Sequence, residues 1–144
     1  MATENDFDGL AELLGRVDDD AVIDRDGNPN RVIDDQFAFD VKIKWSVRPP
    51  STAKVLDGQW TVKLYAESVG PGPEKQIGTT TRPATGVAAY KATITVPAGT
   101  LPSDVPPDSG VYKLVIVITY RNTLGQLTEM AAFAEGPMVL LRRP

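Results

Sequence analysis

The stretch that decides the fold runs from Phe37 to Val47, reads FAFDVKIKWSV, and places a large apolar residue at every second position. Successive side chains of a β-strand point to opposite faces, whereas the side chains of a helix repeat every 3.6 residues. The period of two therefore predicts a half-buried β-strand, with Trp45 among its inward residues and Lys42 and Lys44 facing water.

A second stretch, Val111–Tyr120 with the sequence VYKLVIVITY, is apolar on both faces. A strand of this kind needs cover on both sides. A single sandwich covers only one face of each of its sheets. We therefore expect the second cover to come from the N-terminal segment of the same chain or from another subunit.

Further short strands are predicted at 59–68, within 75–81, and at 88–96, 127–134 and 138–141. None of the 12 prolines falls inside a predicted strand, as expected for residues that cannot donate to a sheet. The near copies 21–24 and 31–34 predict either a short hairpin or an edge strand formed by the second copy alone. Strands at this spacing without intervening helices indicate a sandwich or a barrel.

The segment Asp108-Ser109-Gly110-Val111-Tyr112-Lys113-Leu114 resembles the D-x-G-x-Y-x-C signature of immunoglobulin-like domains. The resemblance implies an all-β, immunoglobulin-like antiparallel β-sandwich of about seven strands over residues 31–144. It also implies that the Tyr112 hydroxyl bonds back to the preceding loop and that Trp60 is buried. Leu114 stands where that family has its second cysteine. The architecture by itself does not indicate a function.

Charge divides the chain unevenly. Residues 1–40 hold 12 acids and 3 bases, a net charge of −9, while residues 41–144 hold 7 acids and 12 bases, a net charge of +5. This asymmetry predicts an acidic N-terminal arm, residues 1–30, beside a mildly basic body. The arm is either solvated or docked on a basic surface of its own chain or of a neighbour.

The arm also contains a predicted short helix over Phe7–Val17, preceded by Asp6 as a candidate N-cap. Its apolar residues recur at helical spacing: Phe7, Leu10, Leu13, Leu14 and Val17. A helix of this length is marginal alone in water, so its apolar stripe is expected to dock on another surface.

The outward residues of strand 111–120 form the other half of a predicted interface. In the register set by Tyr112, the side chains of Val115 and Val117 point outward, and Tyr65 on the neighbouring strand 59–68 joins them. Monomeric proteins seldom expose large apolar patches. We therefore expect this face to be covered by the helix Phe7–Val17 or by a second subunit.

The composition argues against most enzymes. The chain has no histidine and no cysteine, which removes the commonest general base and the thiolate nucleophile. Its net charge of −4 and the few aromatics beside its lysines argue against nucleic acid as a partner. No apolar run approaches the roughly 20 residues that span a bilayer, and the N-terminus lacks signal-peptide features, so we predict a cytoplasmic protein without a membrane partner.

One loop offers candidate metal ligands. Asp24, Asp26 and Asn28 present oxygen atoms at alternate positions, like the beginning of a calcium-binding loop. The sixth and twelfth positions of such a loop are Gly and Glu, but here they are Pro29 and Asp35. The segment is therefore either an irregular calcium site or a solvated turn, and no other cofactor is predicted.

Together these patterns favour a non-enzymatic structural or assembly module. It would be a self-associating subunit or a protein–protein adaptor, with a second copy of the chain as the expected partner. The alternative is a ligand-binding β-sandwich that holds calcium or a carbohydrate in its loops.

Overall fold

The computed structural model describes residues 7–8, 14–48 and 53–144. Strands make up the fold there: β1 (Phe7–Asp8), β2 (Leu14–Ile23), β3 (Val32–Asp34), β4 (Phe39–Arg48), β5 (Gln59–Ser68), β6 (Glu74–Pro83), β7 (Ala89–Val96), β8 (Val111–Arg121) and β9 (Leu127–Arg142). The prediction of an all-β sandwich is confirmed, with nine strands in the described residues where about seven were expected.

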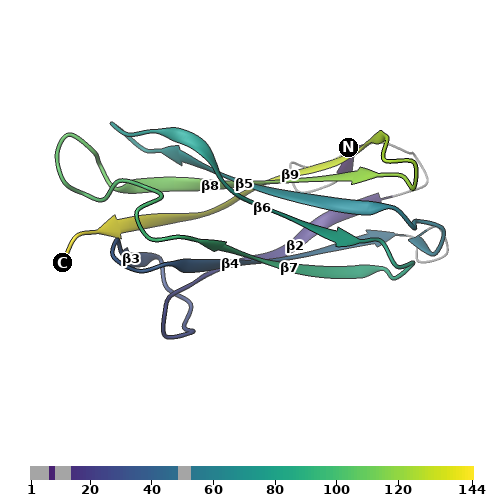
Figure 1. The fold of residues 1–144 in the computed structure, drawn as a ribbon, viewed down its shortest axis with the longest axis horizontal. Helices are drawn as coiled ribbons and strands as arrows, with labels where there is room; N and C mark the ends of the chain where they lie inside the picture. The colour runs from purple at the N-terminus through teal and green to yellow at the C-terminus, as the bar shows by residue number, and fades with distance from the viewer. Residues whose placement is uncertain (1–6, 9–13, 49–52) are drawn as a thin grey trace.

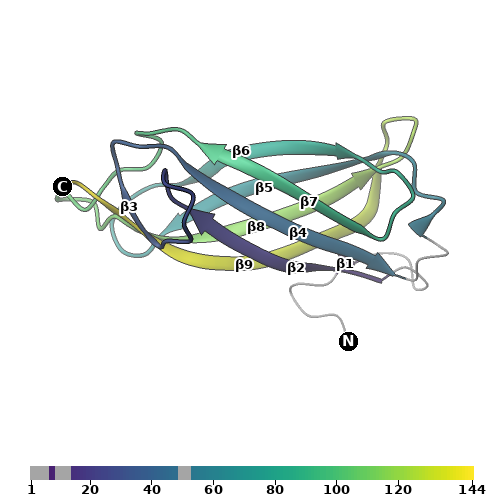
Figure 2. The same ribbon diagram turned by 90° about the horizontal axis from the view of Figure 1, so that it is seen from below.

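The strands form two layers (Figure 1). The larger sheet has the order β1-β9-β8-β5-β6, with β3 also paired to β9, and the smaller sheet has the order β2-β4-β7. Every pairing is antiparallel except that of β3 with β9. Figure 2 shows the layers from below, with β2 beside β9 at one side of the sandwich and β6 beside β7 at the other.

The core lies between the two sheets. Trp45 on β4 and Trp60 on β5 are fully buried, with ring centroids 6.3 Å apart in an edge-to-face arrangement. The two lysines that alternate with these apolar residues on β4, Lys42 and Lys44, are exposed. The period-two pattern of residues 37–47 therefore places its apolar face in the core as predicted.

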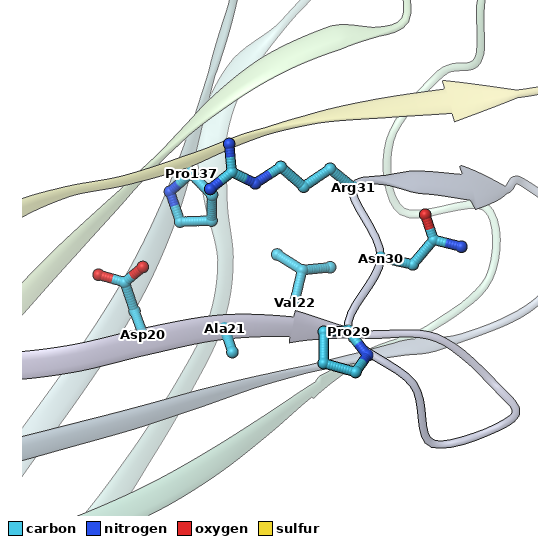
Figure 3. A pocket seen from close by; sticks show the side chains of 7 residues that line it. All are labelled: Asp20, Ala21, Val22, Pro29, Asn30, Arg31 and Pro137. Carbon is cyan, nitrogen blue, oxygen red and sulfur yellow. The ribbon is translucent and has the colours of Figure 1, made fainter.

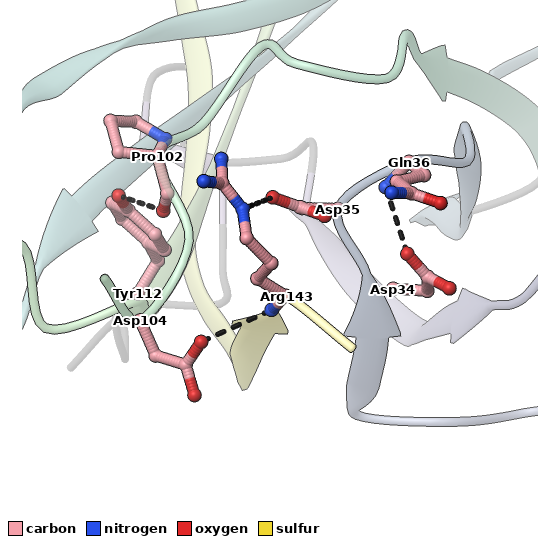
Figure 4. Close-up of polar contacts among 7 residues, drawn as sticks. All are labelled: Asp34, Asp35, Gln36, Pro102, Asp104, Tyr112 and Arg143. Atoms are coloured by element: carbon pink, nitrogen blue, oxygen red, sulfur yellow. Dashed lines mark hydrogen bonds and ion pairs between the residues drawn. The ribbon is translucent and has the colours of Figure 1, made fainter.

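A buried tyrosine ties the long loop before β8 to the core. The Tyr112 hydroxyl donates a hydrogen bond to the Pro102 carbonyl oxygen at 2.8 Å (Figure 4). Burial raises the pKa of this hydroxyl, and the nearby charge of Asp108 acts in the same direction. Tyr112 therefore stays a hydrogen-bond donor at neutral pH, and the predicted closure of the loop is confirmed.

The helix predicted over Phe7–Val17 is wrong wherever the segment is described. Residues 7–8 form β1 on β9, and residues 14–17 begin β2, which pairs with β4. Val17 is 3% exposed and lies in the core. Pairing with β4 satisfies the backbone of β2, whereas a short helix would have gained little stability by itself. Part of the predicted arm is thus a strand of the sandwich.

The repeated segments 21–24 and 31–34 do not form a hairpin. Residues 32–34 form β3, an edge strand parallel to β9, and only an isolated bridge joins Ile23 to Pro29. The strands predicted at 127–134 and 138–141 are one strand, β9, with a register shift against β8. The shift falls at Gly136-Pro137, where two residues of β9 stand against Leu114 alone, as in a β-bulge.

Candidate interaction surface

The outer face of the larger sheet carries a group of apolar side chains, with the ion-paired Lys113 among them. Register places them on the face opposite the core, since their neighbours along each strand are buried between the sheets. We call this group the outer apolar face; it consists of Val32, Tyr65, Val111, Val115, Val117, Phe133, Met138 and Leu140. Three of these side chains are well exposed: Val32 at 46%, Phe133 at 43% and Met138 at 47%.

The centre of this face lies on β8. Val115 stands opposite Tyr65 on β5 and opposite Glu135 on β9. It is only 5% exposed although it is not part of the core cluster, so its own neighbours on the outer face cover it. Val117 is half-buried and stands next to Phe133. The predicted outward direction of Val115 and Val117 agrees with this register, but the valine ladder is less exposed than we expected.

Charged side chains frame this centre. The Lys113 ammonium contacts the Glu135 carboxylate at 2.8 Å and the Glu67 carboxylate at 3.8 Å. Lys63 on β5 stands opposite Val117 on β8 and is exposed. It takes part in none of the ion pairs between described side chains. Lys113 and its two carboxylates thus lie toward the start of β8, and Lys63 lies beside Val117 farther along that strand.

The structure separates the N-terminal residues that we predicted for the interface. Phe7 lies on β1 at the edge of the larger sheet, and Leu14 is the first residue of β2 in the smaller sheet. Leu10 and Leu13 lie outside the described residues. Val17 is in the core of the same chain, so it is not available to a partner. Only Tyr65, Val115 and Val117 remain together on one face.

The sequence pattern did not indicate that Phe133 and Met138 share this face, because the alternation of apolar residues along β9 changes phase. The bulge at Gly136-Pro137 shifts the alternation, so that Phe133 and Met138 reach the same face although their separation is odd. A period-two reading across the whole segment would place them on opposite faces. Treating Gly136-Pro137 as a bulge could have found them.

The predicted calcium loop is closed by one of its own carboxylates. Asp24 Oδ1 accepts hydrogen bonds from the backbone amides of Asp26 and Asn28, both at 3.0 Å, and Oδ2 accepts one from the Asn30 side chain at 3.3 Å. These bonds, that of Asn28 first, hold the pKa of Asp24 below its ordinary value. The described residues contain no group of three or more acidic, His or Cys side chains placed to hold a metal. Asp24 therefore acts as a turn-closing residue.

A shallow hollow of about 360 Å³ lies on the open side of the sandwich between β2 and β9 (Figure 3). Asp20 and Ala21 line it from β2, and Pro137 lines it from β9. The Arg31 side chain extends toward Pro137 across its upper rim in this view. The hollow combines one cation and one carboxylate over a small apolar floor.

The end of the C-terminal strand is fixed by polar contacts beside β3 (Figure 4). The Arg143 backbone amide donates to the Asp104 carboxylate at 3.1 Å, and its guanidinium Nε contacts the Asp35 carboxylate at 3.4 Å. These contacts join the loop before β8, the turn after β3 and the end of β9. They stabilise the arrangement that holds β3 beside the outer apolar face.

Comparison with known proteins gives a structural match. The chain is similar to a crystal structure of the C-terminal domain of Wzt, with a TM-score of 0.64 and 10% sequence identity, over 96% of this chain and 78% of that one. No family model and no curated protein matches the sequence. At this identity the similarity supports the β-sandwich fold alone. No helix in the described part of the chain is long and apolar enough to span a membrane.

Proposed function

We propose that the chain is a non-enzymatic assembly module that associates with a second copy of itself through the outer apolar face. The observation that carries the proposal is the exposure of two large apolar side chains on one sheet face: Phe133, opposite Val117, and Met138, opposite Lys113. Burial of such side chains is the main favourable term in protein association. An immunoglobulin-like relationship, supported by the Tyr112 closure, is part of the proposal.

The charges around the face favour a second copy over an unrelated protein. In a two-fold symmetric pair, any residue that faces a second residue is faced by it in return. Lys63 on β5 and Glu135 on β9 lie on opposite sides of β8, so one two-fold arrangement brings each Lys63 opposite the Glu135 of the other copy. The pair would then have two equivalent ion pairs around an apolar centre.

A charge exchange tests this arrangement. Lys63→Glu should weaken self-association because it places like charges at both rims. Glu135→Lys should weaken it for the same reason, and it also breaks the contact with Lys113 within the chain. Exposed pairs contribute about 0.2–1 kcal/mol each, so we expect each single variant to raise the dissociation constant roughly tenfold. The double variant should restore association toward the wild-type level. Light scattering across a dilution series measures all four proteins.

The control variant is Asp57→Lys, which makes the same charge change as Glu135→Lys at an exposed position of the loop before β5. It changes net charge without touching the outer apolar face and should leave association unchanged. Equal weakening by Asp57→Lys and Glu135→Lys would mean that net charge alone decides association. Failure of the double variant to recover would contradict the two-fold arrangement.

A ligand-binding module is the second candidate function. A small hollow of about 130 Å³ beside the loop of Asp24 is also lined by Asp26 and Asp34, and carboxylates can bind calcium or sugar hydroxyls. Calorimetric titration with calcium and with simple sugars tests it. Heat of binding that disappears in Asp26→Asn would favour this candidate, whereas no heat with either ligand would exclude it.

A further inference from the structure

The outer face of the smaller sheet gathers cations. Lys42 and Lys44 on β4 and Lys91 on β7 are exposed, and Lys44 stands directly opposite Lys91. All three line a shallow depression of about 350 Å³. The floor of the depression follows the backbone of β4 and β7, whose alternate side chains, such as Ile43, point into the core.

Arg82 adds a fourth cation from the other sheet. It lies near the end of β6, and its guanidinium Nε donates to the Lys91 carbonyl oxygen at 3.2 Å. This bond fixes the guanidinium at the edge of β7, beside the three lysines. We call Lys42, Lys44, Lys91 and Arg82 the cationic cluster. The described residues that line its depression include no carboxylate.

Two cations of the cluster are expected to repel each other in the free protein. Like charges directly opposite each other on neighbouring strands destabilise a sheet, and Lys44 stands opposite Lys91. None of the ion pairs between described side chains involves Lys42, Lys44 or Lys91. The acids of β2 come near from the other side of β4, where Asp18 lines a neighbouring hollow together with Lys44 and Lys91. No carboxylate among the described residues lines the depression that the four cations share.

We propose that the cationic cluster binds a soluble multivalent oxyanion of the phosphate type. Lysine ammonium groups bind phosphate as point charges, and arginine offers several fixed N–H donors. Lysines two residues apart on a strand are about 7 Å apart, and neighbours across strands about 5 Å, so several cations can contact one multivalent anion. The outward side chains of β4 and β7 include no aromatic residue, so the face lacks a platform for stacking bases or sugar rings.

Thermal unfolding of the full chain with inorganic pyrophosphate tests the proposal. Potassium chloride of equal ionic strength provides the reference, because general screening also relieves repulsion. We expect pyrophosphate at tenfold excess over its dissociation constant to raise the Tm by about 3–5 °C beyond the chloride reference. Lys91→Gln should lose this rise. In plain buffer the same variant should unfold at the wild-type Tm or above it, because it removes one of two opposed cations.

The matched control is Lys75→Gln, which makes the same charge change at an exposed position near the start of β6, at the opposite end of that strand from Arg82. It should keep the full pyrophosphate response. Equal loss of the response in Lys75→Gln and Lys91→Gln would overturn the proposal, since binding would then follow net charge rather than the cluster. A wild-type protein that responds no more to pyrophosphate than to chloride would overturn it as well.

Discussion

The two outer faces of this sandwich are built from strands of the same period but differ in chemistry. On the larger sheet, outward residues of β8 and β9 such as Val117 and Phe133 are apolar. On the smaller sheet, outward residues of β4 and β7 such as Lys44 and Lys91 are cationic. Both sheets bury a similar apolar inner face, so the core does not account for the difference. The proposed partners follow this difference: a second copy of the chain for the outer apolar face and a multivalent oxyanion for the cationic cluster.

The largest expected effect separates the inner from the outer face of a single strand. Trp60→Ala on β5 should lower the free energy of unfolding by about 3–5 kcal/mol, because it leaves a cavity in the core. Tyr65→Ala, on the outer side of the same strand, should cost clearly less in dilute solution. Urea unfolding of both variants measures the difference. Equal losses would mean that Tyr65 is as essential to the single chain as Trp60.

The next effect concerns the centre of the outer apolar face. Val115→Lys should destabilise the single chain by about 1–3 kcal/mol, because Val115 is 5% exposed and a lysine there must displace its neighbours to reach water. Val55→Lys, the same substitution at a side chain that is 71% exposed, should change stability by less than about 0.5 kcal/mol. Chemical unfolding compares the two variants. A neutral Val115→Lys would show that this side chain is not packed against its neighbours.

A smaller effect is expected at the tyrosine closure. Tyr112→Phe removes the hydrogen bond to the Pro102 carbonyl and keeps the ring in the core, so it should cost about 0.5–1.5 kcal/mol. Amide hydrogen exchange should rise mainly in the loop before β8. Uniform acceleration across β4 and β5 instead would mean that the hydroxyl stabilises the whole sandwich rather than the loop.

The smallest effect is pH dependent and lies in the loop after β2. Because the pKa of Asp24 is lowered in the folded protein, the ionised carboxylate favours folding. This contribution is complete above the ordinary aspartate pKa of about 4 and is lost as pH falls through the lower folded-state value. The difference in free energy of unfolding between Asp24→Asn and the wild type should therefore become smaller below about pH 4. A difference that stays constant from pH 7 into acid would contradict the role of the charge.

Sequence periodicity predicted the inner faces well and the outer faces only in part. The alternation around Trp45 and the position of Tyr112 were sufficient to predict a β-sandwich, because both are local sequence patterns. The spacing of Phe7, Leu10, Leu13, Leu14 and Val17 matched a helix, but pairing with β4 outweighed that preference over the described residues. Arg82 and Lys91 come together only through the contact of β6 with β7, which local pattern does not contain.

Residue-resolved NMR tests most directly whether the outer apolar face associates with a second copy of the chain. Amide spectra of the full chain are compared between dilute and concentrated solution at constant salt. The account predicts shifts and broadening confined to β5, β8 and β9 around Val117 and Phe133, abolished by Phe133→Ser, with β4 and β7 unchanged. Spectra that do not change with concentration, or changes centred on Lys44 and Lys91 instead, would contradict it.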